Sequence, residues 1–319
     1  MTSRQSVVVK AARLVQRLPL SWLRVLEAPL VRIRGRNCSN PQLVIILALP
    51  RSGSTLIYQC FIHGLQPLYL SNLWNLWYSL PCLGGSLSAR MCATYQSEFQ
   101  SSQGFVQGIC GPAEGLRFWS YWCGCGLDEV RDVHVQDVVL TRRVRYLRRT
   151  LSLLTTPEKP FVCGYIGHAL AVERLRLWFP EAIFVRLHRD PLSNAASILR
   201  SRQKGSCGWF SVFPKECEGV KGANEYTQAA AQVYWLNRRL KVLENDEQTI
   251  HISYEDLCIK PRRVFQRVVD LCNEKGMRLK LRQELPESFD YKEVHGDENE
   301  DVASLGQALK KLEKKHGPL

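Results

Sequence analysis

A run of apolar residues that leads directly into a short polar turn constrains this chain more than any other feature. Residues 43–49 carry no polar side chain, which is typical of a strand buried on both faces of a parallel sheet. Pro50 ends the run, and the turn residues 51–55 follow. From Leu56 onward the apolar spacing is helical. We therefore expect a strand, a tight turn and a helix start in direct succession.

This turn has the composition of an anion-binding site. Free N–H groups at a helix N-terminus point at a ligand, and the helix dipole favours negative charge. Gly53 allows close backbone approach, Ser54 and Thr55 add hydroxyl donors, and Arg51 adds a planar cation. The simpler alternative is a helix start that Ser and Thr merely cap, but capping needs no arginine.

The pattern differs from the loop that binds nucleoside triphosphates. That loop needs Gly, four residues, and then Gly-Lys-Ser/Thr. Here no glycine lies upstream in the turn, and Ser54 follows Gly53 without an intervening lysine. ATP or GTP hydrolysis by the usual apparatus is therefore disfavoured.

Residues 50–55 resemble the 5′-phosphosulfate loop of sulfotransferases, whose pattern is Pro-Lys/Arg-Ser-Gly-Ser/Thr-Thr. A second match lies in residues 179–200, where Arg189 and Ser197 stand eight positions apart around Arg-Asp-Pro, as in that family's 3′-phosphate site. Guanidinium binds phosphate bidentately and a hydroxyl adds a donor. On its own, Arg189-Asp190 would read as a surface ion pair at a helix start. A weaker third match, Tyr254-Glu255-Asp256-Leu257, follows an expected strand and is interpreted as structural.

The chain thus resembles the sulfotransferases that use 3′-phosphoadenosine-5′-phosphosulfate (PAPS), in their bacterial-type or carbohydrate-type branch, over about residues 41–275. The resemblance implies an α/β three-layer fold with a short central parallel sheet, related to P-loop kinases. It implies that Arg51 stabilises charge on the bridging oxygen of the leaving nucleotide, without a metal. The cofactor-binding residues that it implies are Arg51, Ser52, Gly53, Ser54, Thr55, Arg189 and Ser197.

The general base is not settled by the motifs, because it is His in some branches of the family and Glu in others. Glu114 resembles an acidic segment of bacterial-type members, and it lies among aromatic residues whose packing would raise its pKa. His168 is the other candidate, although a locally satisfied residue at a helix start would explain it equally well. We favour Glu114. Gly164 or Cys163 stands where many relatives carry lysine, which leaves the acceptor contact or full activity open.

Composition bounds the ligands and the compartment. The formal charge of +13 suits an anionic ligand such as PAPS. The sequence has no zinc-finger spacing and no aromatic RNA-binding pattern, so we do not expect it to bind nucleic acid. We interpret the 12 cysteines as mostly buried thiols in a reducing compartment, with some disulfides as the alternative. There is no long apolar run and no secretory signal. We therefore expect a cytoplasmic protein, with peripheral membrane contact as an open alternative.

Three regions are expected along the chain: a basic N-terminal extension (1–40), a sulfotransferase domain (41–290), and an acidic loop with a basic helix (291–319). Residues 1–36 hold eight Lys or Arg and one acid, Glu27. They could form a helix docked on the domain, a helix on an anionic membrane surface, or a mitochondrial-type presequence.

The aromatic-rich residues 64–130 either contribute to an acceptor pocket, as the resemblance implies, or simply pack in the core. The spacing predicts helices over 137–156 and 225–244. The expected function is transfer of a sulfuryl group to a hydroxyl of a carbohydrate, lipid-linked or small-molecule acceptor. The alternatives are a kinase-like phosphoryl transferase and an inactive nucleotide-binding or anion-binding scaffold. The oligomeric state is left open.

Overall fold

The computed structural model describes residues 25, 27–29, 31–33, 39–101, 104–127, 138–204, 209–291 and 300–319. Within these residues, five parallel strands form one sheet in the order β2-β3-β1-β4-β5. The strands are β1 (Leu43–Leu47), β2 (Leu68–Tyr69), β3 (Phe161–Gly164), β4 (Ile183–His188) and β5 (Thr249–Ser253). The expected α/β fold with a short central parallel sheet is confirmed.

Strand β1 lies in the middle of the sheet and is buried on both faces, as its apolar run predicts. Leu43, Ile45 and Leu47 pack into one hydrophobic cluster. Val44 and Ile46 pack into a second cluster on the opposite face. Alternation along a strand thus divides the core into two layers.

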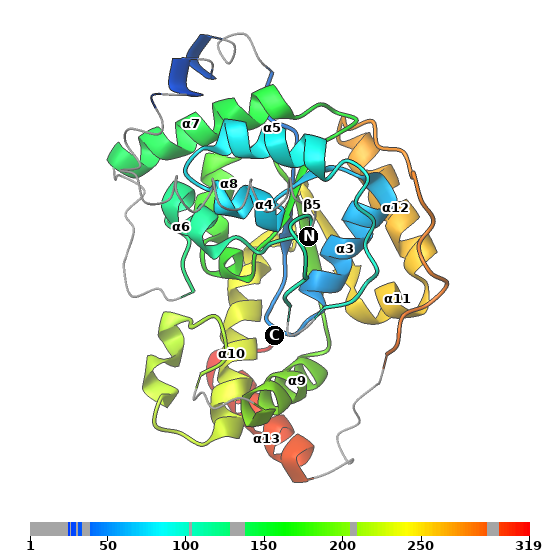
Figure 1. Ribbon diagram of the computed structural model, residues 1–319. Coiled ribbons are helices and arrows are strands. Elements are labelled where there is room, and N and C mark those ends of the chain that lie inside the picture. The colour runs from blue at the N-terminus through cyan, green and yellow to red at the C-terminus, as the bar shows by residue number, and fades with distance from the viewer. Residues whose placement is uncertain are drawn as a thin grey trace.

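Helices cover both faces of the sheet (Figure 1). One face is covered by α3 (Ser54–Leu65), α11 (Tyr254–Ile259) and α12 (Pro261–Glu274). The other face is covered by α6 (Leu116–Cys123), α7 (Val138–Leu154), α8 (Val172–Trp178), α9 (Pro191–Lys204) and α10 (Glu225–Leu240). Helices α7 and α10 confirm the two predicted over 137–156 and 225–244.

The remaining elements are short or peripheral. They are α4 (Asn72–Leu76), α5 (Pro81–Met91), α13 (Glu300–His316) and the 3₁₀ helices η1 (Ile166–Leu170), η2 (Lys215–Val220) and η3 (Lys241–Leu243). Helix α13 lies beside α9 and α10 (Figure 1). Its Asp301 accepts a 2.7 Å hydrogen bond from the hydroxyl of Tyr226, which ties the end of the chain to the domain.

Part of the basic N-terminal segment packs on the domain. Glu27 is 4% exposed, and its carboxylate accepts hydrogen bonds from the backbone N–H groups of Cys82 and Leu83. These N–H groups belong to the first turn of α5, so the carboxylate caps that helix and complements its dipole. Tyr146 of α7 also donates to Glu27, at 2.9 Å. The only acidic residue of residues 1–36 therefore docks this part of the segment on the domain.

Residues 1–24, which carry much of the predicted basic helix, lie outside the described residues, as do residues 292–299 of the acidic loop. The division of the chain at residues 40 and 290 stays a prediction. Among the described residues, no helix is both long enough and apolar enough to cross a membrane.

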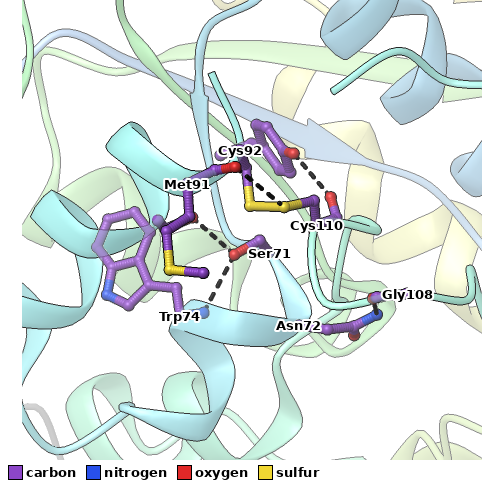
Figure 2. Close-up of a disulfide and its surroundings, with 9 residues drawn as sticks. Ser71, Asn72, Trp74, Met91, Cys92, Gly108 and Cys110 are labelled. Carbon is purple, nitrogen blue, oxygen red and sulfur yellow. Dashed lines mark hydrogen bonds between the residues drawn. A yellow bond between two sulfur atoms is a disulfide. The ribbon is translucent and has the colours of Figure 1, made fainter. Parts of the chain in front are cut away.

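A disulfide joins Cys92, just after α5, to Cys110 in the loop that follows (Figure 2). The remaining cysteines of the described residues are free thiols, nearly all buried. The structure therefore has mostly buried thiols, as predicted, together with one disulfide among the described residues, which was the alternative. The bridged loop is also fixed to α4, because the side-chain amide of Asn72 donates to the carbonyl oxygens of Val106 and Gly108. The loop leads directly to Glu114.

Candidate active site

The carboxyl ends of four strands open on one cavity of about 670 Å³. Arg51 follows β1, Tyr165 follows β3, Arg189 follows β4 and Tyr254 follows β5, and all four line this cavity. In the sheet, β3 and β4 flank β1 on opposite sides. Crevices at such a switch point are where open α/β sheets bind ligands.

Most of the predicted site residues meet at this cavity, although they come from distant parts of the chain. The predicted residues that line it are Arg51, Gly53, Ser54, Thr55, Glu114 and Arg189. Ser52, His168 and Ser197 do not line it.

The turn after β1 has an unusual backbone that its sequence explains. Arg51 and Gly53 both have positive φ, of 60° and 92°, and Gly53 is the residue that precedes α3. A Cβ at Gly53 would lie 2.3 Å from the ring of Tyr254, so only glycine fits there. The hydroxyl of Ser52 is buried and donates to the carbonyl oxygen of Leu49 at 2.7 Å. Ser52 therefore shapes the turn and points its side chain away from the cavity.

Side chains of the β4–α9 connection hold the carbonyl groups of this turn. Arg189 Nη1 donates to the carbonyl oxygen of Arg51 at 2.8 Å. Asn194 Nδ2, in the first turns of α9, donates to the carbonyl oxygen of Pro50 at 2.8 Å. The two motifs are thus one hydrogen-bonded unit, although nearly 140 residues separate them in the sequence.

Tyr254 joins the same unit from a third strand. Its ring lies under the Arg189 guanidinium, 4.6 Å from centroid to Cζ, which is a cation–π contact. Burial raises the pKa of its phenol to about 12. The sequence interpretation of this residue as structural is incomplete, because its ring supports one arginine and forms part of the cavity wall.

Two arginines lie close together at this turn, and within the described residues neither forms an ion pair with a carboxylate. Burial, followed by the nearby positive charge of Arg189, lowers the pKa of Arg51. The Nε atoms of Arg51 and Arg189 are both buried, and neither has a hydrogen-bond partner among the described residues. Such orphaned donors cost free energy unless a ligand satisfies them. An anion with phosphate or sulfate oxygens fits this end of the cavity.

Arg189 and Asp190 have other partners than the surface ion pair that was the alternative interpretation of this segment. The carboxylate of Asp190 accepts a 2.7 Å hydrogen bond from the backbone N–H of Ser193 and so caps α9. The backbone N–H of Asp190 donates to Glu255. Arg189 is therefore directed to the cavity and to the β1–α3 turn.

Glu114 lines the same cavity close to the helix start of α3. A Cβ placed on Gly104 would lie 3.3 Å from Glu114 Oε1 and 3.5 Å from Thr55 Oγ1. The two oxygens are therefore at most about 7 Å apart. Burial raises the pKa of this carboxyl to about 7, which suits a group that exchanges a proton near neutral pH.

His168 lies in the core. Its side chain is 0% exposed, and its ring contacts those of Trp119 and Tyr165 at centroid distances of 4.5 and 5.2 Å. Burial lowers its pKa to about 3, so the imidazole is neutral at ordinary pH. Neither ring nitrogen has a hydrogen-bond partner in the part of the chain that the structure describes. Of the two candidate bases, Glu114 alone reaches the cavity.

Ser197 is on α9, two turns after the helix start, and is 7% exposed. Its predicted contact with a 3′-phosphate stays a prediction. Gly164 ends β3, and a Cβ there would lie 3.4 Å from the Tyr58 ring. A small void beside Gly164 is also lined by Thr55 and Glu114.

Sequence reasoning missed Asn194 as part of this site. It lies five residues after Arg189, in the segment that carried the second motif. An Asn in the first turns of a helix that follows a parallel strand is a signal that could have identified it. The start of such a helix lies next to the turn after the adjacent strand, so the amide can reach that turn.

A family model described as "Sulfotransferase family" matches residues 132–276. This span includes the Arg189 motif and the Tyr254 segment, whereas the Arg51 turn lies outside it. No curated protein sequence matches the chain significantly.

Solved structures show the same fold. Sulfotransferase STF1 from Mycobacterium tuberculosis H37Rv superposes with a TM-score of 0.51 at 17% identity, covering 99% of this chain and 86% of that one. Sulfotransferase STF9 from Mycobacterium avium gives a TM-score of 0.50 at 14% identity, covering 95% of this chain and 74% of that one. The family match over residues 132–276 and the shared α/β fold with a five-stranded parallel sheet make this chain similar to the sulfotransferases.

Proposed function

We propose that this chain transfers a sulfuryl group from PAPS to the hydroxyl of an acceptor. The observation that carries the proposal is the pair Arg51 and Arg189, which share one cavity with Glu114. Both arginines have buried, unpartnered Nε donors there. PAPS carries phosphate at two positions and supplies an activated sulfuryl group, so one molecule offers anionic oxygens to both arginines.

The residues of the β1–α3 turn would hold the 5′ end of the nucleotide. The N-terminus of α3 directs free N–H groups and the positive end of its dipole to the cavity. Ser54 and Thr55 add hydroxyl donors. Arg51 would stabilise the negative charge that grows on the phosphate during transfer, as preorganised cations do in phosphoryl transfer. Arg189 would bind the 3′-phosphate and brace the turn at the same time.

Glu114 would act as the general base. With a pKa raised to about 7 by burial, its carboxylate is basic enough to take a proton and is still largely ionised slightly above neutral pH. The near approach of Glu114 to Thr55 brings the carboxylate close to the turn that would hold the sulfuryl end. His168 has no route to this proton, because it is fully buried in the core.

A thermal-shift measurement with 3′,5′-adenosine bisphosphate, ATP and AMP tests the nucleotide class. A ligand at one hundred times its dissociation constant stabilises a protein by about 2.7 kcal/mol. We expect a clear rise in melting temperature with the bisphosphate and little with AMP. Stabilisation by ATP with Mg²⁺ but not by the bisphosphate would instead support the kinase-like alternative.

A second candidate, nucleotide binding without transfer, is favoured by one observation. Gly164 provides no cation next to the void that Thr55 and Glu114 line, where many relatives of the resembling family carry lysine. Incubation with PAPS labelled in the sulfuryl group separates the two candidates. Binding of the bisphosphate without release of label to any acceptor supports the inactive scaffold, and turnover supports the enzyme.

A further inference from the structure

The chain segment that carries Glu114 runs antiparallel to the residues that lead into α4. The backbone N–H of Ala113 donates to the carbonyl oxygen of Leu70 at 2.8 Å. The backbone N–H of Asn72, the first residue of α4, donates to the carbonyl oxygen of Gly111, also at 2.8 Å. The position of Glu114 at the cavity is therefore set by how the preceding loop packs on the start of α4.

This loop closes around the side chain of Asn72. The Nδ2 atom donates to the carbonyl oxygens of Val106 and Gly108, at 2.9 and 2.8 Å, and Figure 2 shows the second contact. A primary amide has two N–H donors, so one loop uses both of them. A Cβ on Gly111 would lie 2.6 Å from the carbonyl oxygen of Gln107 and 2.7 Å from that of Val106. Only glycine allows so tight a loop.

The loop has further anchors on other helices. The disulfide between Cys92 and Cys110 joins it to the end of α5, and Gln59 of α3 donates to the carbonyl oxygen of Gln100 at 3.0 Å. Asn72 differs from both anchors, because it binds the loop before and after Cys110 and itself lines the cavity. It is therefore a side chain that links the loop directly to the cavity wall.

We propose that Asn72 is a positioning residue for Glu114: its amide holds the loop against the start of α4, which keeps the Glu114 carboxyl group at the cavity near Thr55. This inference rests on the proposed function, in which the Glu114 carboxylate takes the proton of the acceptor hydroxyl. Removal of the amide should let the loop open and expose the carboxyl group. Burial raises the pKa of Glu114 to about 7, so exposure should bring this pKa back toward its ordinary value of 4.5.

A double-mutant cycle on the full chain without ligand tests this role, because it needs no acceptor. Melting temperatures are measured at pH 4.5 and pH 8 for the wild type, Glu114→Gln, Asn72→Ala and the double variant. In the wild-type background, Glu114→Gln should gain melting temperature over its parent between the two pH values, since the buried carboxyl group costs stability once it ionises. In the Asn72→Ala background, we expect about half of this gain or less.

The pH profile of label transfer from PAPS gives a second readout. In Asn72→Ala, the rise of kcat/KM near pH 7 should move to lower pH, and kcat should fall severalfold. The affinity for 3′,5′-adenosine bisphosphate should stay unchanged. A residue that merely stabilises the fold would lower the melting temperature without moving the pH profile.

Two matched controls anchor the same loop without Asn72. Gln59→Ala removes an amide donor to a loop carbonyl from a residue outside the cavity lining, and Cys92→Ala/Cys110→Ala removes the covalent link to α5. Both should lower the melting temperature and leave the pH-dependent gain from Glu114→Gln as it is in the wild type. Where Asn72→Ala does not fold, Asn72→Ser takes its place in the cycle. Failure of both variants to fold would assign Asn72 to the stability of the whole domain and overturn the proposal.

Three other outcomes overturn the positioning role: an undiminished gain in the Asn72→Ala background, an equal loss of the gain in Gln59→Ala, or no gain in the wild type. In each of them the nucleotide site still stands. Failure of the wild type to bind the bisphosphate, or full transfer by Glu114→Gln, would instead contradict the proposed function. The cycle without ligand would still report where the Glu114 carboxyl group lies.

Discussion

Arg189 Nη1 donates a 2.8 Å hydrogen bond to the carbonyl oxygen of Arg51. The contact connects the end of β4 to the turn after β1. Arg51 has a φ of 60°, which is unfavourable for a residue with a side chain, and the hydrogen bond helps to hold its carbonyl group in this conformation. Asn194 holds the preceding carbonyl, that of Pro50, in the same way. The positive charge of Arg189 and the backbone conformation of the Arg51 turn are therefore coupled.

Replacing the two arginines should have different effects. Arg51→Ala should abolish transfer and leave the fold intact, because the side chain is proposed to stabilise developing charge. Arg189→Ala should weaken binding of 3′,5′-adenosine bisphosphate and also lower kcat, because it removes the brace on the Arg51 carbonyl. Calorimetry and label transfer measure both effects. The control Arg278→Ala removes an exposed ion pair with Glu158 and should change neither.

Asn194→Ala should impair transfer through the turn rather than by direct contact. It leaves the buried carbonyl of Pro50 without its donor, which costs about 1–3 kcal/mol of folding free energy, and it loosens Arg51. We expect a fall in kcat that exceeds the change in KM. Asn273→Ala is a control away from the cavity: its side-chain amide donates to the carbonyl oxygen of Leu279, and its side-chain oxygen accepts from the backbone N–H of Leu279. If Asn273→Ala lowers kcat as much as Asn194→Ala, a general loss of stability explains both.

The pH dependence of transfer should follow Glu114. Because burial raises its pKa to about 7, kcat/KM should increase as pH rises through about 7. Glu114→Gln should remove most of the activity, and the activity that remains should no longer rise with pH near 7. A rise that persists in the variant would assign the ionisation to another group.

Ionisation of Glu114 should also lower the stability of the protein as pH rises, whereas it raises the activity. Its pKa is about 7 in the folded state and near the ordinary value of 4.5 when unfolded. The folded state then holds more protons between these values, so the free energy of unfolding falls as pH rises through that interval. We measure the melting temperatures of the wild-type protein and of Glu114→Gln without ligand, at pH 4.5 and at pH 8. The change in their difference between the two pH values gives the contribution of Glu114 ionisation to stability.

His168 should contribute to stability and not to proton transfer. His168→Ala leaves a cavity between Trp119 and Tyr165, and we expect a loss of about 3 kcal/mol. Transfer per folded molecule should be retained below the melting temperature, with an unchanged pH profile. Complete loss of kcat in folded His168→Ala would contradict the assignment of Glu114 as the base.

The disulfide should stabilise the loop that precedes Glu114. Cys92 and Cys110 close a loop of sequence separation 18, for which loop-closure entropy predicts about 3 kcal/mol. A reducing agent should therefore lower the melting temperature of the wild-type protein. The double variant Cys92→Ala/Cys110→Ala should melt at the lower temperature with or without the reducing agent. Identical melting of the oxidised wild type and the double variant would show that the bridge adds nothing.

Sequence patterns were most informative where local chemistry dictates local structure. The apolar run of β1, the turn at Gly53 and the helix start at Ser54 follow from burial, positive φ and free N–H groups, and all lie where the sequence predicts. Strand β5 spans Thr249–Ser253 as expected, and α9 begins at Pro191. Both helices predicted from apolar spacing over 137–156 and 225–244 are present.

By itself, then, the sequence determined strand β1, the turn after it and the arginines that follow two strands, because strand burial and turn conformation depend on neighbouring residues. The α/β fold was predicted from the resemblance to sulfotransferases, which those motifs carry. Only the tertiary structure decided that His168 is in the core, that Glu114 reaches the cavity, and that Tyr254 supports Arg189. The direction of a side chain and the partner of a buried polar atom depend on packing between segments far apart in the chain, which no local pattern encodes.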